Sequence, residues 1–167
     1  MRWRRQLDGR VAEVMAGAGG ERLLAWGVLT DDRVAVCTDQ AIHAPEIGRV
    51  AWDRVVRGAW SEEFLDLVVQ AAPGRRPAHA RLRFAEPGQV PGVVRERVEW
   101  TVVASHPAQL THPDGRQGSA MLNARRSPVD GDIRWAVVFD PGIDPGDPGW
   151  RAAADEALAE LRAQLGT

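Results

Sequence analysis

The apolar residues of this chain repeat with two different periods, and the period changes along the sequence. Between residues 21 and 84 they form the short runs RLLAWGVL, RVAVCT, AIHAP, RVAW, VVRGAW, FLDLVVQA and AHARLRF, separated by brief polar joints. Short runs rich in Val, Ile, Leu and Trp are typical of strands, and joints this short favour antiparallel neighbours. The pattern therefore predicts an antiparallel meander, with RVAW and VVRGAW joined by a bend at Asp53 and Arg54.

Three other segments repeat their apolar residues with the helical period. Residues 3–15 carry an apolar stripe interrupted by Gly9, which predicts a short helix before the connector GAGGE. In EPGQVPGVVRERVEW, residues 86–100, proline and glycine precede valines on one side and charged residues elsewhere, which predicts a mid-chain helix. The last helix is expected to begin after the N-cap Asp147, with Pro148 in its first position, and to end at Gly166.

The runs TVVASHPAQL, GSAMLNARR and DIRWAVVF return to the extended pattern and predict three further strands. The sequence leaves open whether they complete the first sheet or form a second one. We expect a single α+β domain over residues 1–167, with an N-terminal helix and linker (1–20), a meander (21–84), and a helix, three strands and the C-terminal helix (88–167). The predicted fold is a bent antiparallel sheet or partial barrel with the mid-chain and C-terminal helices packed on it.

Seven tryptophans are the largest apolar side chains of the sequence. Those within predicted apolar elements are expected to pack in the core, because burial of an indole removes a large apolar area from water. The expected core anchors are Trp52, Trp60, Trp135, Leu158 and Leu161. Trp3 and Trp150 lie near element ends and are the candidates for an interaction surface, where aromatic residues concentrate binding energy.

Length and cysteine content narrow the class of protein. A chain of 167 residues is long enough to bury a hydrophobic core without disulfides. The single cysteine, Cys37, cannot form an internal disulfide, and no apolar run approaches the roughly 18 residues that a membrane span needs. The N-terminus MRWRRQLDGR lacks the apolar core of a signal peptide. We therefore expect a cytoplasmic protein with no membrane insertion.

All 21 basic residues are arginine, yet the formal net charge is -2. The arginines are scattered among 23 acids, whereas a nucleic-acid footprint usually concentrates positive charge on one face. Such a face would have to assemble in three dimensions, and its candidates are Arg75, Arg76, Arg81, Arg83, Arg125 and Arg126. RNA or ribosome-associated binding is therefore an alternative rather than the leading hypothesis.

Residues 21–71 resemble the strands of bacterial pleckstrin-homology-like domains. A Thr-Asp pair, Thr38 and Asp39, turns two strands, and a strand that ends in Trp52 leads into a bend at Asp53 and Val55. The chain also resembles an uncharacterised actinobacterial family of similar length with an acidic, proline-rich loop before an Ala/Leu helix. The resemblance implies a bent sheet closed by a helix, and a domain that binds proteins, peptides or acidic lipids. The segment TDDR, where such domains carry basic residues, offers two acids and one arginine, which disfavours phosphoinositides.

No catalytic or metal-binding motif emerges from the sequence. His106, His112 and Asp114 have no standard ligand spacing and are expected in an exposed loop. Cys37 and His43 lack an identifiable orienting group for nucleophilic chemistry, so Cys37 is expected in the core. Proline follows each of Asp140, Asp144 and Asp147, and the spacing of a calcium loop is missing, which favours turns and capping. We expect no cofactor and no enzymatic activity.

These observations favour a non-catalytic protein-interaction module. It would bind an unknown protein partner, or self-associate, through an exposed sheet face, edge or groove. The alternatives are the arginine-mediated RNA or ribosome binding described above and a small-molecule site inside the curved sheet, which would require an apolar pocket beside Trp52 or Trp60.

Overall fold

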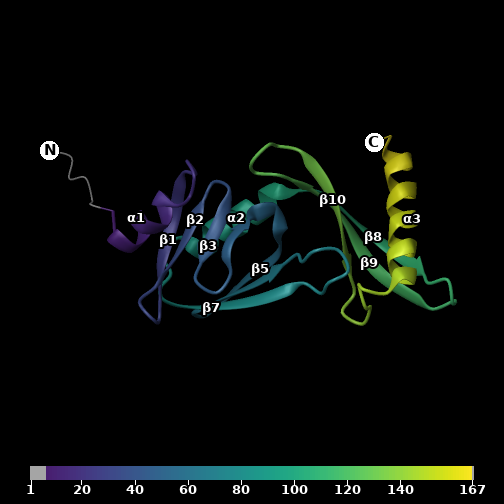
Figure 1. Ribbon diagram of the computed structural model, residues 1–167, viewed down its shortest axis with the longest axis horizontal. Helices are drawn as coiled ribbons and strands as arrows, with labels where there is room; N and C mark the ends of the chain where they lie inside the picture. The colour runs from purple at the N-terminus through teal and green to yellow at the C-terminus, as the bar shows by residue number, and fades with distance from the viewer. Residues whose placement is uncertain (1–6, 167) are drawn as a thin grey trace.

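The alternating segments fold into a seven-stranded antiparallel sheet of order β4-β3-β2-β1-β7-β6-β5 in the computed structural model, which describes residues 7–166 (Figure 1). Its strands are β1 (Leu23–Leu29), β2 (Val34–Thr38), β3 (Ala41–Ala44), β4 (Gly48–Ala51), β5 (Val55–Ser61), β6 (Phe64–Val69) and β7 (Ala78–Glu86). The expected bend after β4 is a 3-10 turn, η1 (Trp52–Arg54), which carries the chain to the far edge of the sheet.

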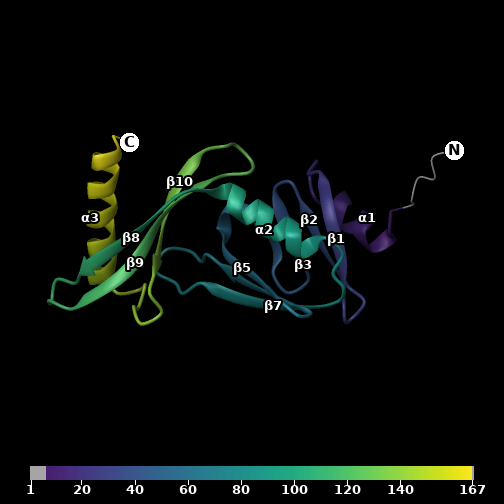
Figure 2. The ribbon, with the colours of Figure 1, turned by 180° about the vertical axis from the view of Figure 1, so that it is seen from behind.

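The concave face of this sheet is covered by the mid-chain helix α2 (Val90–Thr101), seen from behind in Figure 2. Trp52, Leu67 and Phe84 are buried in the main core together with Val90 and Val94 of the helix. The helix can approach β5 closely because Gly58 has no side chain: a Cβ there would lie 2.9 Å from Cγ1 of Val94. The helix and the sheet therefore bury their apolar faces against each other.

Residues after α2 form a second sheet, which answers the question that the sequence left open. Strands β8 (Val102–Thr111), β9 (Gln117–Arg126) and β10 (Ile133–Phe139) pair in the order β10-β9-β8. Helix α3 (Pro148–Leu165) packs on this smaller sheet rather than on the larger one, and its N-terminal amide is capped by Asp147 as predicted. The molecule is elongated, with α3 at the end opposite the N-terminal helix α1 (Gly9–Ala16) (Figure 1).

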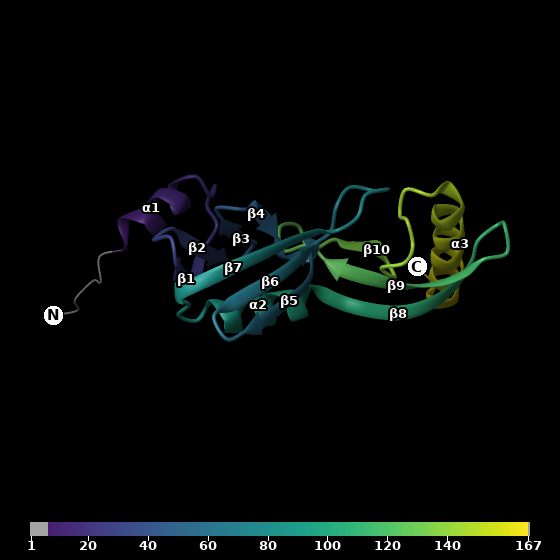
Figure 3. The same cartoon turned by 90° about the horizontal axis from the view of Figure 1, so that it is seen from below.

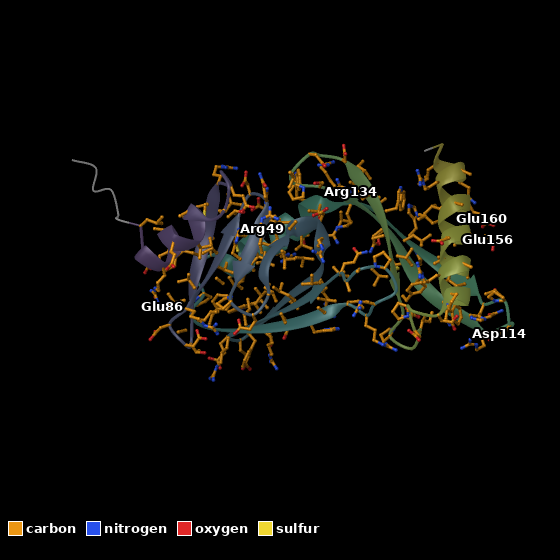
Figure 4. The ribbon with its side chains drawn as sticks, viewed as in Figure 1. Arg49, Glu86, Asp114, Arg134, Glu156 and Glu160 are labelled. Atoms are coloured by element: carbon orange, nitrogen blue, oxygen red, sulfur yellow. The ribbon has the colours of Figure 1, made fainter. Side chains whose placement is uncertain are left out.

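One buried arginine fastens the two sheets together. The Arg125 guanidinium of β9 donates hydrogen bonds to the carbonyls of Trp52 (3.1 Å) and Val55 (2.8 Å) and to the hydroxyl of Thr101. Nearby, Arg134 lies where β10 meets the larger sheet, 3.7 Å from the Asp53 carboxylate (Figure 4).

The predicted α+β class, with its bent antiparallel sheet and its mid-chain and C-terminal helices, is confirmed. Among residues 7–166, no helix has both the length and the apolar character to cross a membrane.

Candidate functional site

A groove of about 710 Å³ lies between the two sheets, a volume within the range typical of ligand sites. One wall is the outer face of β5 to β7, where Arg57, Val68 and His79 are cross-strand neighbours, together with the loop 70–77. The other wall is formed by the loop before α3 and the first turns of that helix. The five consecutive residues 135–139 of β10 run along it, so the groove follows the edge of a strand.

The free edge of β10 presents unpaired backbone groups to this groove. At the two ends of the β9–β10 ladder, Asp140 donates its N–H to Ser119 and Ser127 donates to Asp132. Hydrogen-bonded and non-bonded pairs alternate in an antiparallel ladder. In the observed register Trp135, Val137 and Phe139 are therefore the non-bonded positions, with N–H and C=O directed away from β9. Within residues 7–166 no other backbone group bonds them.

The lining of the groove beside β10 combines apolar and basic side chains. On the side of α3, Val137 and Phe139 pack against a cluster that contains Leu110, Ile143 and Trp150. Arg57, Arg75 and Arg76 also line the groove. An extended segment beside β10 would therefore lie among both apolar side chains and guanidinium groups.

The walls of the groove are held by specific contacts. Arg76 donates a hydrogen bond of 3.2 Å to the carbonyl of Pro141, which ties the β6–β7 loop to the loop before α3; the two loops approach each other in Figure 3. Beneath α3, Gly118 of β9 leaves room for the helix, since a Cβ there would lie 2.6 Å from Ile143 and 3.0 Å from the Trp150 ring.

Two residues expected on an interaction surface are buried instead. Arg125 is only 5% exposed because it serves as the connector between the sheets; burial lowers the pKa of its guanidinium, and the Asp53 carboxylate opposes this effect. Trp150 is also 5% exposed, since its ring fills the space above Gly118 and contacts His112 edge-on at 5.1 Å. Trp3, the other aromatic candidate, lies outside the described residues.

The remaining arginines of the candidate basic face do not form one surface. Arg81 and Arg83 lie on the exposed side of β7, pair with Asp66 and Glu63, and stack on the Phe64 ring. Arg126 lies over the Trp100 ring at 5.1 Å, on another part of the molecule. Arg75 and Arg76 lie in the β6–β7 loop and belong to the groove. Of the six candidate arginines, only Arg75 and Arg76 line the groove.

The expected core anchors divide into buried and partly exposed residues. Trp52 is fully buried, and its indole N–H donates to the Thr38 carbonyl at 2.8 Å. Trp60 is 37% exposed, contrary to expectation, because β5 is an edge strand and the start of α2 leaves a hollow beside it. Trp135 is half-buried because it lines the groove.

Leu158 and Leu161 are also only half-buried. The fully buried residues of α3, Trp150 and Ala154, belong to its first turns. The helix therefore docks by its N-terminal part, and the predicted apolar stripe is only partly covered along its later turns.

The candidate chemical residues serve structural contacts. His106 lies within β8, not in the expected loop, because the strand extends from residue 102 to 111. His112 is half-buried, with Nε2 3.1 Å from the Asp147 carboxylate and Nδ1 2.9 Å from that of Asp114. Cys37 is fully buried, which raises the pKa of its thiol to about 12. Across residues 7–166 there is no cluster of three or more potential metal ligands.

A buried polar cluster around Glu21 was not expected from the sequence. The carboxylate accepts hydrogen bonds from Thr38 (2.8 Å) and Arg49 (2.6 Å), and it lies 2.7 Å from Nε2 of His43. Burial would raise the pKa of this carboxyl, but these partners outweigh burial and hold the pKa below its ordinary value. Its four members come from separate segments, so only tertiary contact reveals the cluster.

The comparisons with known proteins identify no relative of this chain. No protein-family model matches the sequence, and neither the curated proteins nor the solved structures contain a match. The groove is therefore interpreted from its own geometry.

Proposed function

We propose that the protein is a non-catalytic intracellular interaction module that binds an extended segment of a partner protein in the groove beside β10. The observation that carries this proposal is the row of outward-directed backbone groups at Trp135, Val137 and Phe139 inside the groove. A peptide strand satisfies such groups by continuing the sheet, while its side chains fill the adjacent pockets.

The groove favours a single strand over a second copy of the chain. The β6–β7 loop and the first turns of α3 both form walls of the groove beside the β10 edge. A strand that arrives as part of another sheet would bring neighbouring strands against these walls, whereas an isolated segment would not. Residues 135–139 offer an edge of about 17 Å, since antiparallel strands rise roughly 3.4 Å per residue.

The architecture supports the resemblance to pleckstrin-homology-like domains without supporting lipid recognition. A bent seven-stranded sheet followed by a covering helix is the arrangement that the resemblance implies. In the segment between β1 and β2, however, the single arginine, Arg33, is paired with Asp31 and Glu46. Little free positive charge remains there for a phosphoinositide headgroup.

The test is a display selection from a random peptide library on the immobilised protein, followed by binding to Val137→Pro and Val137→Ala variants. Proline removes the outward N–H of Val137 but no hydrogen bond to β9, and alanine is the matched control that keeps the N–H. We expect selected peptides to bind the alanine variant and to lose at least tenfold in affinity for the proline variant. Equal affinity for both variants would contradict strand addition.

Hydrogen exchange supplies a second readout that needs no substitution. A bound strand should protect the amides of Trp135, Val137 and Phe139, while those of Ala136 and Val138, already paired with β9, should change little. Uniform protection along β10, or none, would count against the proposal.

A further inference from the structure

The second feature of the groove is an excess of uncompensated positive charge. Four exposed arginines border it: Arg57 from β5, Arg75 and Arg76 from the β6–β7 loop, and Arg151 from α3. The acids among its lining residues are Asp140 and Asp155. No ion pair with a carboxylate engages any of these four arginines within residues 7–166. Of these four side chains, only that of Arg76 donates a hydrogen bond within residues 7–166, to the Pro141 carbonyl.

This arrangement differs from that of other exposed arginines on the protein. Arg81 pairs with Asp66, Arg95 with Glu99 and Arg116 with Asp114. The chain as a whole carries more acids than bases, with a formal charge of -2. The groove therefore carries several arginines without a carboxylate partner although the protein as a whole is negatively charged. Such a groove is electrostatically suited to an anionic ligand.

The free edge of β10 indicates which class of anionic ligand fits the groove. Outward N–H and C=O groups recur at alternate residues of β10, a repeat that matches an extended polypeptide and that a sugar-phosphate backbone does not reproduce. In a strand added there, one set of alternate side chains would share the face of Val137, Phe139 and the α3 cluster. The other set would share the face of Ala136 and Val138, which line the groove together with Arg57.

We propose that the groove selects extended segments in which acidic residues alternate with apolar ones, a specificity that rests on the strand addition proposed above. The apolar residues would pack towards Val137, Phe139 and their cluster, and the carboxylates would pair with Arg57, Arg75 and Arg76, with Arg151 donating hydrogen bonds to a further carboxylate. A guanidinium presents paired N–H donors that match a carboxylate.

Three synthetic eight-residue peptides test the charge preference, with Val alternating with Glu, Gln or Lys. Fluorescence anisotropy at low salt should show the Glu peptide binding about tenfold more tightly than the Gln peptide, as expected for a few partly exposed ion pairs. The Lys peptide should bind more weakly than either. The difference between Glu and Gln should shrink at high salt, because salt screens exposed charges.

Two double arginine variants test whether the preference for the Glu peptide arises in the groove. Arg75→Gln/Arg76→Gln removes two groove cations, and Arg81→Gln/Arg83→Gln removes two cations outside the groove, so both variants change the net charge equally. We expect the first pair to abolish most of the preference for Glu over Gln and the second pair to preserve it.

The outcomes separate this inference from the proposed function. Equal binding of the three peptides, with protection of the Val137 amide, would overturn the acidic preference and leave strand addition standing. Absence of binding for all three, with no peptide recovered from the library selection, would overturn both. Preferential binding of an oligouridylate over the Glu peptide, lost in the Arg75/Arg76 variant, would assign the groove to RNA and overturn the peptide assignment.

Discussion

Arg125 shows how one side chain can define the arrangement of two sheets. Its neighbour Arg126 has the same chemistry but lies on the other face of β9, half-buried over the Trp100 ring. Alternation along a strand directs the two side chains to opposite faces. Arg125 consequently donates hydrogen bonds to two backbone carbonyls, those of Trp52 at the start of η1 and Val55 at the start of β5.

We predict that Arg125→Met destabilises the protein by about 2–3 kcal/mol, because it removes several charge-assisted hydrogen bonds to buried acceptors. The matched variant Arg126→Met should cost less than about 1 kcal/mol, since its partner is a half-exposed ring contact. Urea unfolding of both variants measures the difference. A similar small effect of the two substitutions would mean that Arg125 does not fasten the sheets.

Glu21 is a second single residue that stabilises the fold, and its contribution depends on pH. Its folded-state pKa is lowered by its partners, so the unfolded chain binds the proton first as pH falls. The stabilisation is therefore present above the ordinary glutamate pKa of about 4.3 and is lost as pH falls from about 5 through the folded-state pKa.

We predict that Glu21→Gln lowers the free energy of unfolding by about 1–3 kcal/mol at pH 7. The loss should shrink as pH falls from about 5 through the folded-state pKa, because the wild-type carboxyl becomes protonated first in the unfolded and then in the folded chain. Urea midpoints between pH 3 and 7 provide the measurement, and Glu13→Gln on α1 is an exposed control. A loss that stays constant over this range would show that the charge of Glu21 is not what stabilises the fold.

At the scale of elements, the docking of α3 depends on the lack of a side chain at Gly118. The N-terminal turns of the helix place Trp150 directly above this glycine, with Ile143 from the preceding loop beside it. The helix forms one wall of the groove, so its height above β9 sets the width available to a bound strand.

We predict that Gly118→Ala destabilises the protein by about 1–3 kcal/mol, since overpacking forces Ile143 and the Trp150 ring to move. Gly142→Ala in the loop before α3 is the control, because a Cβ there meets nothing within 4 Å; it should change stability by less than about 0.5 kcal/mol. Thermal unfolding compares the two. Peptide affinity should fall for Gly118→Ala only, and an unchanged affinity would argue that α3 does not border the bound strand.

For the whole molecule, the two sheets have separate hydrophobic cores. The main core draws its buried residues from positions 25–94, and the core beneath α3 draws its buried residues from positions 110–154. Polar contacts of Arg125 and Arg134 connect the halves. Figure 4 shows the acidic residues Glu156 and Glu160 on α3 at the far end of the molecule from α1, away from the seven-stranded sheet.

We predict that residues 1–101 fold without the second sheet, because the helix that completes their core, α2, is included. A cooperative thermal transition and a dispersed amide spectrum would support this, and buried Trp52 offers a fluorescence signal for the folded state. An unfolded fragment would show that the contacts of Arg125 are essential to the first core, and the protein would then be a single cooperative unit.

Much of the fold could be predicted from the sequence because local patterns and burial agree. The strand runs between residues 21 and 84, the bend at Asp53, and the cap at Asp147 all match the structure. The candidate site could not be predicted, because its walls come from β5, β6, β10 and α3, which are distant in sequence. Arg75 and Arg76 were singled out, but nothing in the sequence placed them beside β10.

The sequence by itself determined the elements, since periodicity and turn chemistry act over a few residues. Tertiary structure decided how deeply residues of the same type are buried. Trp52 is enclosed by α2 and the larger sheet, whereas Trp60 lies on an edge strand. Arg125 is buried, whereas Arg126 is only half-buried. These differences depend on what packs against each element. For the same reason the open edge of β10 and its arginine border emerge only when the two sheets are placed together.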